Sequence, residues 1–118
     1  MIQLKVKEFV NSKKKIYVYG TGKRGRGVRA YIKHYLREID GWLVSDGRKT
    51  ADVIDGVPVY ECSSLQCNEE DGVIIGVSKE FYEDVVEQIL ANSSIKNVCF
   101  TDREYDLGRA IYYLEKNN

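Results

Sequence analysis

The apolar residues of this 118-residue chain recur with two different spacings, and the spacing alternates along the sequence. Short, continuous apolar runs that end at glycine or polar residues are typical of buried strands. Runs of this kind predict strands at residues 15–20, 42–45, 56–61, 72–77 and 96–101. The run at 72–77, Gly-Val-Ile-Ile-Gly-Val, contains no polar residue, which predicts that both of its faces are buried.

Apolar residues three and four positions apart predict helices between these strands. The expected helices cover residues 2–12, 25–39, 79–92 and 101–116. Ser78 precedes the third helix and is placed to cap its amino end, while Thr101 and Glu104 have the spacing of a capping box at the fourth. The inner face of the third helix is expected to carry Phe81, Val85, Val86, Ile89 and Leu90.

Strands that alternate with helices favour parallel pairing through right-handed crossovers. The sequence therefore predicts one α/β domain over residues 1–118 with a Rossmann-like three-layer fold. Its core is expected to be an open parallel five-stranded sheet of strand order 3-2-1-4-5, with helices on both faces. Pro58, the only proline, cannot donate a hydrogen bond within a sheet, so the third strand is expected at the sheet edge. Residues 47–55 have no sustained period and are expected to form a loop.

The 18 basic and 18 acidic residues cancel, so the formal net charge at pH 7 is zero. Nothing in this balance favours a nucleic acid or an anionic membrane as partner. Cys62, Cys67 and Cys99 show no Cys-x-x-Cys spacing, and His34 is the only histidine, which argues against a metal site. Free thiols are typical of a reducing compartment, so the sequence predicts a cytoplasmic protein without a metal cofactor.

Residues 20–25, Gly-Thr-Gly-Lys-Arg-Gly, match the pattern G-x-G-x-x-G. A predicted strand precedes them, a predicted helix follows, and Asp46 lies about twenty residues further on, which is the context of this pattern in dinucleotide-binding proteins. Gly20 is expected to allow a sharp turn, Gly22 to let a phosphate approach the backbone, and Gly25 to let the helix pack closely on the strand. The free N–H groups at the start of the helix would then bind a diphosphate.

Basic residues crowd the same turn. Lys23, Arg24 and Arg26, together with Arg29, either donate hydrogen bonds to the phosphate or face solvent, and Arg24 is the best candidate for a phosphate contact because it lies within the loop itself. For any single one of these residues, a charge that simply faces solvent is the alternative.

Further contacts are expected from the ends of other strands. Asp46 would accept hydrogen bonds from ribose hydroxyls, or alternatively form a turn in Ser-Asp-Gly, and as an acid it argues against NADP. Gly76 would leave room for a base or sugar, and Ser78 offers a hydroxyl besides its capping role. The predicted cofactor-binding residues are Gly20, Thr21, Gly22, Lys23, Arg24, Gly25, Asp46, Gly76 and Ser78.

The chain resembles the Rossmann-like domains of bacterial surface-sugar biosynthesis proteins in five segments: VYGTGKRGR, GWLVSD, IDGVPVYECSSL, GVIIGVS and IKNVCF. These domains are the N-terminal domain of sialic-acid and bacillosamine-type sugar acyltransferases and the N-terminal part of polysaccharide-type sugar-nucleotide dehydratases. The resemblance covers residues 15–100. It implies a bound nucleotide-sugar or NAD, and a role in polysaccharide or glycan biosynthesis beside a further domain or partner enzyme.

No catalytic set can be assembled from the sequence. Tyr112 and Lys116 have the Tyr-x-x-x-Lys spacing of the dehydratases, but no sugar-holding domain follows them, so we do not interpret them as catalytic. The sequence thus predicts a module that binds NAD or a nucleotide-sugar without complete catalytic machinery. The alternatives are a fragment of an NAD-dependent sugar-nucleotide dehydratase or epimerase, and a structural or oligomerisation module that has lost its ligand. The tyrosine-rich last helix supports the latter and is a candidate homodimer contact.

Overall fold

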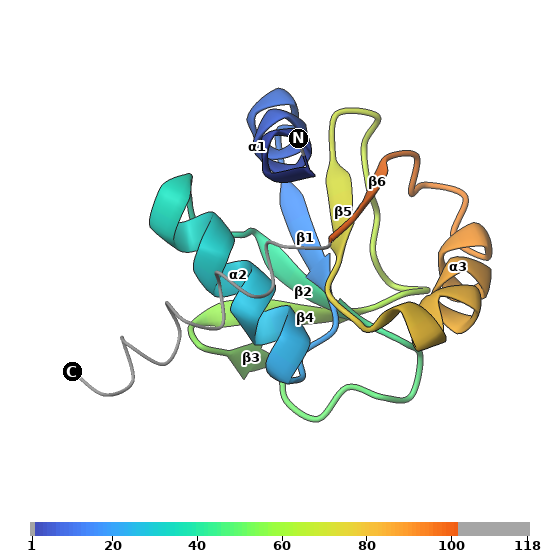
Figure 1. The fold of residues 1–118 in the computed structure, drawn as a ribbon. Coiled ribbons are helices and arrows are strands. Elements are labelled where there is room, and N and C mark those ends of the chain that lie inside the picture. The colour runs from blue at the N-terminus through green and yellow to red at the C-terminus, as the bar shows by residue number, and fades with distance from the viewer. Residues whose placement is uncertain (1, 102–118) are drawn as a thin grey trace.

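A computed structural model describes the backbone of residues 2–101 and the side chains of residues 6–101 (Figure 1). In chain order its helices and strands are α1 (Ile2–Ser12), β1 (Ile16–Tyr19), α2 (Lys23–Tyr35), β2 (Gly41–Val44), β3 (Val53–Ile54), β4 (Val57–Glu61), β5 (Gly72–Ile75), the short 3-10 helix η1 (Lys79–Phe81), α3 (Tyr82–Leu90) and β6 (Val98–Phe100). Helices flank β1 and separate β5 from β6, whereas β2, β3, β4 and β5 follow one another without a helix between them. The predicted last helix, with Tyr112 and Lys116, lies outside the described residues.

The described strands form one sheet with the order β3-β4-β2-β1-β5-β6. The five predicted strands are β1, β2, β4, β5 and β6, and each pairs in parallel with its neighbours among them. Their spatial order is the predicted 3-2-1-4-5. The structure therefore confirms the α/β, Rossmann-like fold class.

The additional strand β3 corrects the prediction that residues 47–55 form only a loop and that β4 lies at the sheet edge. β3 pairs antiparallel with β4, with Val53 opposite Pro58. Asp55 and Gly56 join the two strands with φ angles of 53° and 78°, which is the backbone that a two-residue hairpin turn requires. Pro58 has no N–H group, but the hydrogen bond from β4 to the β3 side of the hairpin is donated by the next residue, Val59, to the Asp52 carbonyl at 2.9 Å. The hairpin therefore tolerates Pro58.

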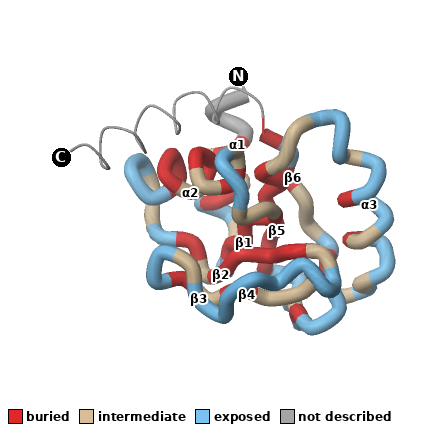
Figure 2. The backbone as a smooth tube through the Cα atoms, turned by 90° about the horizontal axis from the view of Figure 1, so that it is seen from below, coloured by how far each residue is buried: buried red, intermediate tan, exposed pale blue. Residues whose placement is uncertain are grey.

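Helices α1 and α2 cover one face of the sheet and α3 lies against the other (Figures 1 and 2). The core is consequently split into two clusters by the sheet. Along β5, Ile74 belongs to the cluster under α1 and α2, while Val73 and Ile75 belong to the cluster under α3. All four β5 residues are buried, which confirms that this strand is covered on both faces.

Helix α3 is shorter than predicted and buries a narrower stripe. Val85 and Ile89, one turn apart, are buried, whereas Phe81, Val86 and Leu90 are 51%, 36% and 77% exposed. The five-residue inner face was therefore wrong, because a single nine-residue helix at the side of the sheet contacts it along one line of residues. Ser78 also does not cap the helix with its side chain. Its backbone carbonyl instead accepts a hydrogen bond from the Phe81 N–H at 3.0 Å, and this forms the 3-10 turn η1.

Helix α2 begins two residues earlier than predicted and ends at Tyr35 rather than near Ile39. The N–H groups of Leu36 and Arg37 both donate to the Ile32 carbonyl, at 2.8 and 3.0 Å, and this closes the helix. Ile39 is buried, but from the loop that leads into β2.

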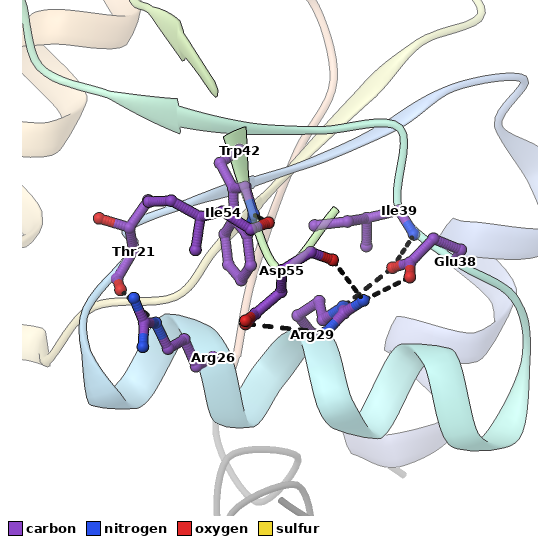
Figure 3. A network of polar contacts seen from close by, with 8 residues as sticks. All are labelled: Thr21, Arg26, Arg29, Glu38, Ile39, Trp42, Ile54 and Asp55. Carbon is purple, nitrogen blue, oxygen red and sulfur yellow. Dashed lines mark hydrogen bonds and ion pairs between the residues drawn. The ribbon is translucent and has the colours of Figure 1, made fainter. Parts of the chain in front are cut away.

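A polar network ties the segment between β2 and β4 to helix α2 (Figure 3). Arg29 of α2 forms ion pairs with Glu38 and with Asp55, the latter at 3.8 Å, and its side chain is only 13% exposed. Trp42 of β2 donates from Nε1 to the Ile54 carbonyl at 3.0 Å. Arg29 therefore holds the β3–β4 hairpin in place, and its assignment to the phosphate corner was wrong.

The Glu38–Arg29 contact predicts a pH dependence of stability. Burial raises the pKa of Glu38, but hydrogen bonds from Arg29 and from the Ile39 N–H outweigh it and hold the pKa below its ordinary value of 4.5. A carboxyl group with a lowered folded-state pKa stabilises the fold above its ordinary pKa and loses that contribution as the pH falls through the lowered value. We expect urea unfolding at about pH 7 and about pH 3.5 to show a smaller pH effect for Glu38→Gln than for the unmodified protein.

The matched control for this experiment is Glu80→Gln, since Glu80 is exposed on η1. Equal pH dependence in Glu38→Gln and in the unmodified protein would contradict the assigned role of the ion pair.

Candidate functional site

The turn after β1 has a backbone that only glycine adopts without strain. Gly20 has a φ of 108°. A Cβ atom at this position would lie 2.9 Å from Val77 Cγ1 and 3.0 Å from the Gly76 carbonyl oxygen. The structure thus confirms the sharp turn that the glycine pattern predicts.

At Gly25, helix α2 packs directly against the backbone of this turn. A Cβ at Gly25 would lie 1.9 Å from the Gly20 carbonyl oxygen, which is far inside any permitted contact. A Cβ at Gly76 would lie 2.9 Å from Gly25 Cα and 3.1 Å from the Tyr19 carbonyl oxygen. Gly25 therefore has the predicted packing role. The space beside Gly76, in contrast, is filled by the protein's own backbone rather than by an open subsite.

The amino end of α2 faces outward at Gly22, which is the N-cap residue and is exposed. Gly22 has no side chain to cap the helix, and a Cβ added there would meet no atom within 4 Å. The first turn of α2 contains no acidic residue and begins with Lys23 and Arg24. Because the first N–H groups of a helix lack acceptors within it and carry partial positive charge, this end favours an anion.

The basic side chains at this turn differ in their surroundings. Lys23 is exposed, and Arg24 is half-buried. Arg26 donates from Nε to the Thr21 carbonyl at 3.0 Å, so it stabilises the turn itself (Figure 3). Lys23 is consequently the basic side chain of the turn that lies fully at the surface.

A cavity of about 610 Å³ opens beside the turn. On the side of β1 and β2 it is lined by Tyr19, Gly20, Thr21, Val44, Ser45, Asp46 and Arg48. On the side of β5 and α3 it is lined by Val77, Phe81, Asp84, Val85, Glu87 and Gln88. From β1 the chain continues first to β2 and β4 on one side of the sheet and then to β5 and β6 on the other, so the strand order reverses at β1. The cavity lies at this topological switch point, where ligands of open α/β sheets bind.

The structure brings together part of the predicted site. Gly20, Thr21 and Asp46 line the cavity. Gly22, Lys23, Arg24 and Gly25 form the neighbouring turn and the first turn of α2. Gly76 and Ser78 do not line the cavity; Gly76 packs under α2, and Ser78 is the N-cap residue that precedes η1.

Asp46 both shapes the site and lines it. Its Oδ1 accepts a hydrogen bond from the Ser63 N–H at 2.9 Å, and the Gly47 N–H donates to the Glu61 carboxylate. These contacts join the end of β2 to the turn after β4. Asp46 also lies in a turn, closed by a hydrogen bond from the Arg48 N–H to the Ser45 carbonyl at 3.0 Å, and its exposed carboxylate borders the cavity.

A tyrosine–serine pair on the cavity wall was not predicted from the sequence. The hydroxyl groups of Tyr19 and Ser45 share a short hydrogen bond at the carboxyl ends of β1 and β2. Burial is the largest cause of the raised pKa of Tyr19, so its hydroxyl stays protonated near neutral pH. The only sequence signal for this pair was the hydroxyl group of Tyr19 at the end of the apolar run Tyr-Val-Tyr. No sequence signal pointed to the α3 residues that line the cavity, because the helical pattern assigned them to the helix core or to solvent.

The described residues contain neither a metal-ligand cluster nor a membrane-spanning helix. No three histidine, cysteine, aspartate or glutamate side chains among them lie close enough to hold a metal ion. None of the helices in the described part of the chain is long and apolar enough to cross a membrane. The three cysteines are free thiols.

The parallel sheet, the glycine turn and the cavity at the switch point define a Rossmann-like domain of the nucleotide-binding class. The chain matches the family described as CoA binding domain over residues 11–102, which include the whole turn and all cavity residues, and it belongs to that family. None of the curated proteins compared with the chain matches it. The Rossmann-like class implied by the sequence resemblance is thus confirmed, while the sugar acyltransferase and dehydratase families stay a prediction.

The glycine packing makes a prediction about stability. Gly25→Ala should lower the free energy of unfolding by about 3 kcal/mol, because its Cβ overlaps the Gly20 carbonyl and α2 must move away from β1. Gly22→Ala is the matched control and should cost less than about 1 kcal/mol, since its Cβ meets open space. Urea unfolding followed by circular dichroism measures both. Equal losses in the two variants would contradict the packing role of Gly25.

The environment of Cys62 predicts a low thiol reactivity. Burial, with a smaller contribution from Asp46, raises the pKa of Cys62 to about 11. At about pH 8 only roughly one thiol in a thousand is then ionised. We expect Ellman's reagent to modify Cys62 in the native protein far more slowly than in guanidinium chloride. Rapid native modification, located by peptide mass spectrometry, would show that the thiol is accessible and activated.

Proposed function

We propose that this domain binds a nucleotide that carries a diphosphate, with the diphosphate at the amino end of α2 and the nucleoside in the cavity. The observation that carries the proposal is the geometry of residues 20–25. Gly20 turns the chain sharply, Gly22 leaves the helix end open, and no acidic residue stands in the first turn. The same turn borders the cavity, so one ligand reaches both.

Coenzyme A is the first candidate ligand. Membership of the CoA binding domain family supports it. Arg48 lines the cavity two residues beyond Asp46, and its guanidinium group suits the 3′-phosphate that distinguishes coenzyme A from most other nucleotides.

NAD or a nucleotide-sugar is the second candidate. The exposed Asp46 carboxylate at the end of β2 favours a ribose with free hydroxyl groups, which donate to it, and disfavours a phosphate on that ribose. This candidate would fit the role in bacterial glycan biosynthesis, in the cytoplasm, that the sequence resemblance implies.

The proposed role is binding rather than catalysis by this domain alone. Among the described residues, those that line the cavity include neither histidine nor cysteine. Tyr19, with its raised pKa and its hydrogen bond to Ser45, does not serve as a base near neutral pH. A reaction on the bound nucleotide would therefore use groups from another domain or from a partner enzyme.

Calorimetric titration with coenzyme A, dephospho-coenzyme A, NAD and UDP-N-acetylglucosamine tests the proposal. Gly22→Val should abolish binding while the helical signal is retained, because the side chain occupies the phosphate position. If coenzyme A is the ligand, Arg48→Ala should weaken it about tenfold and leave dephospho-coenzyme A unchanged. If NAD is the ligand, Asp46→Ala should weaken it by a similar factor, about tenfold.

Lys49→Ala is the matched control, since Lys49 adjoins Arg48 in sequence but pairs with Asp52 at 2.8 Å outside this cavity. Absence of binding for all four ligands, or normal binding by Gly22→Val, would overturn the proposal.

A further inference from the structure

The α3 side of the cavity carries an exposed aromatic side chain, Phe81, that does not contribute to the hydrophobic core. Phe81 is 51% exposed and belongs to neither core cluster, yet it lines the cavity together with Val77 and Val85. An exposed aromatic ring on a cavity wall offers a flat surface on which a planar ring can stack.

The polar groups beside Phe81 are rich in hydrogen-bond acceptors. Asp84 and Glu87 come from α3, and Asp46 faces them from the end of β2. Carboxylates only accept hydrogen bonds when ionised. Gln88 on the same side can both donate and accept, while Arg48 lies on the side of β2. A ligand group beside Asp84 and Glu87 is therefore expected to donate hydrogen bonds.

Two acidic residues of α3, Asp84 and Glu83, differ in their position relative to the cavity. Tyr19, Asp46 and Asp84 line the same cavity; burial is the largest cause of the raised pKa of Tyr19, and the charges of Cys62, Asp46 and Asp84 also raise it. Asp84 is therefore close to the cavity wall. Glu83 and Val86 line a neighbouring surface hollow with Tyr82 and do not line the cavity, whereas Glu87 borders both.

We propose that the α3 side of the cavity binds the base of an adenine nucleotide, with the ring stacked on Phe81 and the exocyclic amino group donating to Asp84. The inference rests on the proposed function and specifies its base. Among the acceptors of this wall, adenine presents an amino group where hypoxanthine and uracil present carbonyl oxygens. The proposal therefore favours coenzyme A and NAD over uridine-based nucleotide-sugars.

Titration of the full chain with ADP and IDP tests the base directly, because the two nucleotides share the diphosphate and ribose and differ at the amino group. We expect ADP to bind about tenfold or more tightly than IDP, since the amino group makes a charge-assisted hydrogen bond that the IDP carbonyl cannot make. Asp84→Asn should reduce this ratio to near unity, whereas Glu83→Gln should retain it. Both residues are exposed, so neither substitution threatens the fold.

The stacking contact has its own variants. Phe81→Ala should weaken ADP and IDP about tenfold alike, as expected for loss of a base–aromatic stack. Val86→Ala, an exposed apolar position of α3 outside this cavity, should leave both affinities unchanged.

Equal affinities for ADP and IDP in the unmodified protein would overturn the inference and leave the diphosphate proposal standing. A preference for ADP that survives intact in Asp84→Asn would overturn the assigned contact. If ADP, IDP and the four ligands of the previous titration all fail to bind, both proposals fail together.

Discussion

At the carboxyl edge of the sheet, the first turn of α2 lies directly against the turn that ends β1, with no side chain between them. Gly20, Gly25 and Gly76 meet there, and a methyl group at Gly25 would overlap the Gly20 carbonyl. This contact fixes how close the amino end of α2 comes to the strand ends of β1 and β5. The position of the helix end relative to the cavity, and hence the candidate site, depends on it.

The charge around the site changes sign from one side to the other. The amino end of α2 is positive through its backbone and through Lys23, and its first turn has no acid. The α3 wall carries Asp84 and Glu87. A ligand with an anionic middle and a hydrogen-bond donor at one end is complementary to this arrangement. The connections after β2 and after β4, both within the described residues, contain no helix, so that wall is formed by α3 together with Val77 and Phe81 from the segment before it.

Local patterns were sufficient to predict the sheet and the turn. The apolar runs gave the five parallel strands, and the handedness of their connections gave their order. The glycine spacing predicted the sharp turn at Gly20 and the close packing at Gly25 because both are properties of the backbone itself. The strand β3 was missed, although Asp55-Gly56 between apolar residues is a recognised hairpin signal.

Features that depend on distant partners were not predictable in the same way. Arg29 was grouped with the phosphate residues because its partners, Glu38 and Asp55, are brought to it only by the fold. Phe81 was assigned to the core because helical spacing alone does not tell which apolar residues face the sheet. In the structure it borders the cavity instead, so the sequence did not indicate the part of the wall that we propose to contact the base.

The central claim is that backbone amides at the start of α2 bind the diphosphate. It is tested most directly by nuclear magnetic resonance of the ¹⁵N-labelled protein during titration with ADP. The account predicts that the largest amide shifts occur at Gly22, Lys23, Arg24 and Gly25, with little change at Gly72, which lies at the amino end of β5. Saturable binding of ADP that leaves the amides of residues 22–25 unshifted would contradict it.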